Sequence, residues 1–187
     1  MLEGSSFKRA ADSLVGQLTR DHSLATVFGI LNRAIADLEL QLPATPAQAF
    51  GPGAVYDFFK ALNLVISSAQ SSLLIVDPYM DDTIFDAYLS DVPKTVAIRL
   101  LVEGYSAKVK SAAQRFTIQN GNSIEARRSL AFHDRVIFID TGECWVLGMS
   151  IRKAAESKPT YLAPLSPDIA TLKLSHYEQV WANATVI

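Results

Sequence analysis

The sequence predicts an α/β fold: a mixed, mostly parallel sheet flanked by helices, preceded by a helical extension. Through most of the 187-residue chain, short apolar runs alternate with amphipathic segments, a pattern typical of strands joined by crossover helices. Leu73–Val76 is continuously apolar, as expected of a strand that is buried on both faces. Two apolar runs meet at Asp140-Thr141-Gly142, which predicts an antiparallel hairpin and makes the sheet mixed.

The N-terminal part is expected to be helical. Apolar residues recur at helical spacing from Phe7 to Leu40, and Asp21-His22-Ser23 can cap a second helix there. Pro43–Pro46 and Gly51-Pro52-Gly53 indicate a linker. We therefore expect a helical extension in residues 1–50 and a sheet domain in residues 51–187. The apolar stripe of the extension is interpreted as a packing surface, for the sheet, for another subunit, or for an upstream domain or partner protein.

The sheet domain is expected to alternate between helices and strands along its length. The predicted helices cover Val55–Ser68, Thr83–Leu89, Ala107–Phe116 and Pro167–Ala184. The other predicted strands cover Val96–Val102, Ser123–Ser129, Phe132–Ile139 and Cys144–Leu147, with Tyr161–Leu162 as an edge strand.

Composition excludes two classes of protein. Apolar residues make up 49% of the chain and charged residues 19%, which is globular rather than disordered. A net charge of -2 argues against a general nucleic-acid coat, although a local cluster of Arg and Lys can still bind a phosphodiester. Cys144 is the only cysteine and is interpreted as a core residue. With no signal pattern and no apolar run of membrane-spanning length, we expect a cytoplasmic protein.

The most informative segment runs from Phe132 to Asp140. Side chains alternate between the faces of a strand, so His133 and Arg135 are expected to point the same way. An imidazole can attack phosphorus or move a proton near neutral pH, and a guanidinium can hold two phosphate oxygens. Asp140, at the far end of the strand, is expected to orient a histidine.

These residues resemble the motif of the phospholipase D superfamily. The family carries His-x-Lys, four residues, then Asp; His133, Arg135 and Asp140 match this spacing with Arg in place of Lys. Gly148-Met149-Ser150 follows at about the family's distance. The resemblance covers residues 72–181. This single-motif form, without an internal repeat, is similar to a subgroup of bacterial phospholipase D-like domains. It is also similar to the lipid-binding domain that follows the MIT module in a eukaryotic cytokinesis protein.

The resemblance implies roles for individual residues. His133 would be the nucleophile or the acid, Arg135 would clamp the phosphate, and Ser150 would donate a further hydrogen bond to it. The sequence departs from the family in two ways: Arg135 does not have the shape of Lys, and the Asn that follows the family's Ser is missing. Arg152 and Lys153 stand in that region and would add positive charge to the pocket.

Three further residues are candidates for the same sheet edge. Asp77 and Glu103 each end a predicted strand, where α/β folds place ligand sites, and both are expected to support the site from outside. Solvation of a loop or the capping of a helix would explain them equally. Arg127 and Arg128 close another strand; one is expected to face solvent, and we assign Arg128 to the phosphate-binding group.

The family mechanism needs two histidines, whereas neither His22 nor His176 has a matching motif around it. A two-fold homodimer would supply a second His133. We therefore predict a nuclease-like phosphodiesterase that forms a phosphohistidine at a dimeric site and needs no metal or cofactor. The alternative is an inactive module that binds a lipid headgroup, a nucleotide, nucleic acid or a protein, and the Arg substitution and missing Asn favour it. A third interpretation is a flavodoxin-like domain unrelated to phosphate.

Overall fold

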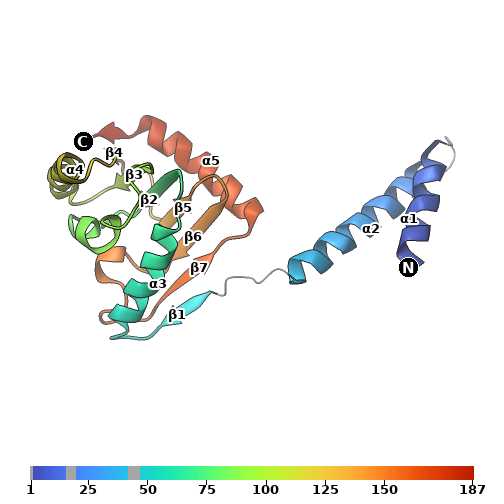
Figure 1. Ribbon diagram of the computed structural model, residues 1–187, viewed down its shortest axis with the longest axis horizontal. Helices are drawn as coiled ribbons and strands as arrows, with labels where there is room; N and C mark the ends of the chain where they lie inside the picture. Colours follow the sequence, from blue (N-terminus) through green and yellow to red (C-terminus); the bar gives the residue numbers. More distant parts are fainter. Residues whose placement is uncertain (1, 16–19, 42–46) are drawn as a thin grey trace. The chain divides into compact units, whose positions relative to one another are not determined.

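The computed structural model describes residues 2–15, 20–41 and 47–187, and the chain divides into two compact units (Figure 1). Met1–Thr45 contains helix α1 (Leu2–Asp12), a 3-10 turn (Ser13–Val15) and helix α2 (Arg20–Gln41). Pro46–Ile187 contains the sheet. The expected linker at residues 43–46 lies outside the described residues. None of the helices in the described ranges combines the length and apolar character that a membrane span requires.

The expected α/β architecture is confirmed. Within the described residues, one sheet has the strand order β1-β7-β6-β5-β2-β3-β4-β8. Its strands are β1 (Gln48–Phe50), β2 (Ser72–Val76), β3 (Ala97–Val102), β4 (Ile124–Arg128), β5 (Val136–Ile139), β6 (Glu143–Leu147), β7 (Thr160–Pro164) and β8 (Thr185–Val186). The division between the two units falls at residue 45, so β1 lies with the sheet.

The expectation of a mostly parallel sheet is wrong. Only the β2–β3 and β3–β4 pairings are parallel among the described strands, and the others are antiparallel. A parallel pairing needs a long crossover connection, which the segments before and after β3 provide. The loop Ser129–Arg135, which leads from β4 to β5, is too short for such a crossover. Strand β5 therefore runs antiparallel to β2, and the hairpin reverses the chain again into β6.

Helices cover both faces of the sheet (Figure 1). Helix α3 (Val55–Ser67), the π-helical turn Phe85–Leu89 and helix α4 (Ser106–Asn120) contribute to one apolar cluster, and helix α5 (Pro167–Asn183) contributes to the other. Strand β5 supplies both clusters by alternation: Ile137 and Ile139 join the α3 face, whereas Val136 and Phe138 join the α5 face.

Two arginines of the sheet, Arg99 and Arg127, contact helix α5. Arg99 donates two hydrogen bonds to the carboxylate of Glu178, at 2.8 and 2.7 Å. The guanidinium carbons of Arg99 and Arg127 lie 5.3 and 4.8 Å from the centre of the Trp181 ring, and Arg127 also donates to the Trp181 carbonyl at 2.8 Å. Because Arg127 is held on the α5 face, its neighbour Arg128 points to the opposite face.

Some strand boundaries differ from expectation. Strand β5 begins at Val136 rather than Phe132, because its partner β2 ends at Val76, which pairs with Val136. Residues 132–135 therefore form a loop at the edge of the sheet. Strand β7 is not an edge strand, since β1 pairs with its outer side. Strands β1 and β8 are too short to show any periodicity in the sequence.

Two expectations about the core are confirmed. Residues Leu73 to Val76 are at most 2% exposed, as a strand covered on both faces must be. Cys144 is buried, and burial raises the pKa of its thiol to about 11. The thiol is therefore protonated at neutral pH and acts as a small packing group.

Two leucines on α3 test the packing of that helix against the sheet. Leu62 is fully buried and Leu64 is 68% exposed. Replacing Leu62 with Ala should lower the free energy of unfolding by about 2–5 kcal/mol, because a cavity remains where the side chain was. Leu64→Ala should change it by less than about 0.5 kcal/mol. Urea denaturation measures both; equal effects would contradict the orientation of α3.

Candidate functional site

The predicted functional residues lie mainly at one end of the sheet. Strands β2, β3 and β4 are parallel, β5 is antiparallel to β2, and β6 is antiparallel to β5. The carboxyl ends of β2, β3, β4 and β6 therefore meet the amino end of β5 at one edge, where open α/β sheets bind their ligands. The loops at this edge begin at Asp77, Glu103, Ser129 and Gly148, and the β4–β5 loop carries His133.

Asp77 connects two of these loops. Its side chain is fully buried and accepts hydrogen bonds from the Tyr79 amide at 2.9 Å, the Ser150 hydroxyl at 2.8 Å and the Ile151 amide at 2.8 Å. Burial raises the pKa of Asp77, although these hydrogen bonds and the charge of Arg135 act to lower it. The carboxylate thus holds the loop after β6 against the loop after β2.

The hydroxyl proton of Ser150 is therefore already used in a hydrogen bond within the protein. Its hydroxyl has one proton, and that proton is donated to Asp77 rather than left free for a ligand. Gly148, two residues earlier, is required by packing: a Cβ there would lie 2.7 Å from Cδ1 of Tyr161. In this structure the Gly-x-Ser segment therefore builds the loop, and the oxygen of Ser150 remains able to accept a hydrogen bond.

Arg135 is half-buried above an aromatic ring. Its guanidinium carbon lies 5.6 Å from the centre of the Tyr79 ring, a geometry that stabilises a cation. Its Nε is buried without a hydrogen-bond partner among the described residues. The fixed positive charge of this guanidinium at the sheet edge is suited to binding an anion.

Asp134, between His133 and Arg135, forms an ion pair with Lys173 of α5. The hydrogen bond from Lys173, followed by that from Tyr177, lowers the pKa of Asp134. Arg135 is directed toward the loop after β2, where its guanidinium lies over the ring of Tyr79. His133 is exposed, so its imidazole is accessible at the sheet edge beside Arg135.

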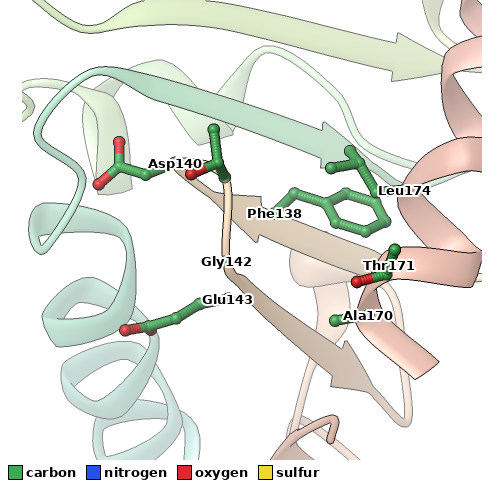
Figure 2. A pocket seen from close by; sticks show the side chains of 8 residues that line it. Phe138, Asp140, Gly142, Glu143, Ala170, Thr171 and Leu174 are labelled. Carbon is green, nitrogen blue, oxygen red and sulfur yellow. The ribbon is translucent and has the colours of Figure 1, made fainter. Parts of the chain in front are cut away.

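Asp140 lies at the opposite end of β5 and does not join this site. Its carboxylate accepts hydrogen bonds from the amides of Gln70, Ser71 and Ser72 and from the Ser71 hydroxyl, the shortest at 2.7 Å. Figure 2 shows the carboxylate directed away from the ring of Phe138, beside a cavity of about 10 Å³ that has room for little more than one water molecule. Asp140 therefore positions the start of β2, in place of the expected contact with a histidine.

The remaining predicted residues are dispersed around the same edge. The Nε of Arg128 donates to the Glu103 carbonyl at 3.0 Å, and Lys153 is exposed. The Glu103 and Gly104 amides both donate to the Pro78 carbonyl, which connects the loops after β2 and β3. The carboxylate of Glu103 makes no contact that assigns it a role. His176 lies on α5 against the ring of Tyr177; the side chain of His22 is outside the described part of the chain.

Tyr105 was missed by sequence reasoning. It adopts a positive φ of 51° just before α4, and its ring lies 4.8 Å from the guanidinium carbon of Arg152. The Nε of Arg152 is 3.9 Å from Asp81 Oδ2 and, like that of Arg135, is buried without a hydrogen-bond partner in the described chain. A signal was present: Asp77-Pro78-Tyr79 and Glu103-Gly104-Tyr105 repeat acid-x-Tyr after consecutive strands. Tyr79 lies under Arg135, which precedes β5, and Tyr105 lies under Arg152, which follows β6.

Similar folds occur in solved structures of the phospholipase D superfamily. Nuc from Salmonella typhimurium, a phospholipase D family member, is 21% identical with a TM-score of 0.56, over 76% of this chain and 97% of that one. NucT from Helicobacter pylori is 15% identical with a TM-score of 0.58, over 76% and 99%. Phosphatidylserine synthase from Haemophilus influenzae is 13% identical with a TM-score of 0.56, over 88% of this chain and 47% of that protein.

These likenesses show that the chain has the phospholipase D-like fold. No protein-family model matches the sequence, and no curated protein matches it. Within the described residues, no three side chains of His, Cys, Asp or Glu are grouped so as to hold a metal ion.

The role of Asp140 leads to a prediction about acid stability. The Ser72 amide and the Ser71 hydroxyl are the main causes that lower its pKa from 3.8 to about 2. A lowered pKa means that the folded state is stabilised above pH 4 and loses this contribution as the pH falls toward 2. Asp140→Asn should lower the free energy of unfolding at pH 7 by about 1 kcal/mol, since the site is partly solvated.

The free energies of unfolding of Asp140→Asn and the wild type should become equal as the pH falls from about 4 to about 2. Urea denaturation at several pH values measures this, with Asp91→Asn on an exposed turn as the control. A constant difference between Asp140→Asn and the wild type across that range would contradict the proposed anchoring.

Proposed function

We propose that this protein is a nuclease-like phosphodiesterase that acts as a cytoplasmic homodimer. The observation that carries the proposal is the pair formed by His133 and Arg135 on a phospholipase D-like fold. His133 is exposed at the sheet edge, and Arg135 lies two residues away with its Nε unpaired. A nucleophile beside a fixed cation is the minimum that attack on an anionic phosphorus requires.

In the proposed reaction, a nitrogen of His133 attacks phosphorus and forms a phosphohistidine. The bond from phosphorus to the leaving oxygen breaks, and that oxygen takes a proton from a second imidazole. Water then attacks the phosphohistidine, gives its proton to the second imidazole and releases the phosphate product. Arg135 neutralises charge on the phosphoryl oxygens, while Arg128, Arg152 and Lys153 add positive charge around the site. No step uses a metal ion.

The second imidazole is the reason for proposing a dimer. His176 lies on α5 beside Tyr177 and near Asp134, but no motif of the family surrounds it, so it is not assigned this role. A two-fold axis near the sheet edge would bring in the His133 of a second subunit. The N-terminal unit offers an additional surface for association, since Phe28, Leu31 and Ile35 of α2 are between 43% and 59% exposed.

A second function is supported by a separate observation. Ser150 gives its proton to Asp77, and Arg135 replaces the family's Lys, so the site is better equipped to bind phosphate than to process it. In this alternative, the protein is an inactive module that recognises a phosphate group of a lipid headgroup, a nucleotide or nucleic acid.

Loss of His133 separates the two functions. In EDTA, the wild type should hydrolyse bis-p-nitrophenyl phosphate and nucleic acid, and His133→Ala should reduce kcat by at least about a thousandfold because the nucleophile is removed. The matched control is His176→Ala, which should retain activity. An active protein that sedimentation equilibrium shows to be monomeric would contradict the two-histidine mechanism.

Arg135 should be required for ligand binding under either function. Equilibrium dialysis of bis-p-nitrophenyl phosphate in the His133→Ala background measures binding without turnover. Arg135→Ala should weaken binding by about tenfold or more, because hydrogen bonds to a charged group are lost. Arg115→Ala, which removes the same charge from the exposed surface of α4, should have no effect. If Arg135→Ala binds as well as its background, the phosphate lies elsewhere.

A further inference from the structure

A groove that Arg152 helps to line carries a series of neighbouring aromatic rings. It has a volume of about 390 Å³ and lies between α3, the Thr83–Tyr88 segment and the loop after β6. The Tyr56 and Phe59 rings are stacked, 6.1 Å apart with an interplanar angle of 28°, and the Phe59 and Tyr88 rings are 5.4 Å apart and tilted by 41°. The series begins at Tyr88, which is buried, and ends at Tyr56, which is 72% exposed.

The exposed end of this series lies at the start of a helix. Tyr56 is in the first turn of α3, and most of its surface is accessible to solvent. Packing explains Phe59 and Tyr88, which contact the main apolar cluster. Tyr56 stacks on Phe59 and leaves most of its surface in water. An exposed ring that already stacks on a second ring at the mouth of a groove is suited to stack on a nucleobase.

Arg152 connects the groove to the candidate phosphate site. It lines the groove and follows Ser150 and Ile151, which are both hydrogen-bonded to Asp77. Its guanidinium lies over Tyr105, and its Nε has no hydrogen-bond partner among the described residues. The carboxylate of Asp81, 3.9 Å away, balances part of its charge. A phosphate beside Arg152 would place its attached nucleoside at the mouth of the groove.

The polar groups of the groove also fit a base. Thr83, Arg152 and Glu156 line it together with the rings and provide both donors and acceptors for the edge of a base. A lipid chain would not use these groups, and stacked rings offer it no advantage over aliphatic walls. Bases in a duplex are already stacked and paired, so an unpaired base is the form that can enter a groove on the protein surface.

We propose that the groove lined by Tyr56, Phe59 and Tyr88 is a nucleobase subsite that selects single-stranded nucleic acid. This proposal rests on the proposed function and specifies its substrate: the base lies in the groove, its phosphate contacts Arg152, and a neighbouring phosphate lies at Arg135 and His133. Tyr56 is then a specificity-determining residue that acts in binding and takes no part in bond cleavage.

The test uses the full-length chain in the His133→Ala background. Fluorescence anisotropy of a fluorescein-labelled oligothymidylate measures the Kd, alone and annealed to its complement. The single strand should bind more tightly than the duplex, and Tyr56→Ala should weaken single-strand binding by about tenfold, as expected from the loss of one stacking contact. Tyr56→Phe keeps the ring and should bind like its background.

Leu64→Ala is the matched control, because it removes a comparably exposed side chain from the same helix and should leave the Kd unchanged. An unchanged Kd in Tyr56→Ala, or no binding of the single strand, overturns the subsite. Tyr56-dependent binding to phosphatidylglycerol vesicles with none to the oligonucleotide also overturns it.

These outcomes separate the two proposals. Tyr56-dependent binding of single strands without hydrolysis of any phosphodiester would support the subsite and refute the phosphodiesterase. Hydrolysis of bis-p-nitrophenyl phosphate, together with an oligonucleotide Kd that is the same in Tyr56→Ala, would support the phosphodiesterase and refute the subsite.

Discussion

The buried carboxylate of Asp77 is the constraint on which the site depends. A carboxylate removed from water is costly unless hydrogen bonds or a nearby cation compensate it. Here two amides, one hydroxyl and the charge of Arg135 provide that compensation. The same contacts fix the loop after β6 against the loop after β2, so the position of Arg152 and the shape of the aromatic groove both follow from them.

In this arrangement, some polar groups of the site are hydrogen-bonded within the protein and others are not. Ser150 is used to build the loop, whereas Arg135 and Arg152 each keep an unpaired Nε. Each arginine also lies over a tyrosine that follows one of two neighbouring strands. Stacking fixes the guanidinium groups without consuming their hydrogen-bond donors. The site can therefore present two oriented cations to an extended polyanion, although the chain as a whole is slightly acidic.

Chemistry at this edge depends on the direction of residues 133–135. Lys173 and Tyr177 hydrogen-bond to Asp134 from α5, whereas the guanidinium of Arg135 lies over Tyr79 in the loop after β2. One exposed imidazole can form a covalent intermediate, but it cannot attack and protonate the leaving group at the same time. Under the proposed mechanism, the second imidazole would therefore come from another subunit.

The sequence by itself determined what local backbone geometry controls. Alternation along β5 divides its residues between the two apolar clusters, and a continuous apolar run marks β2 as buried on both faces. Tertiary structure decided which distant groups meet: Ser150 bonds to Asp77 across 73 residues, Asp140 bonds to Ser71 across 69, and Arg152 lies over Tyr105. Such contacts depend on strand order and direction, which the length of the β4–β5 loop and the packing of whole helices select. The spacing of residues within one segment therefore does not predict these contacts.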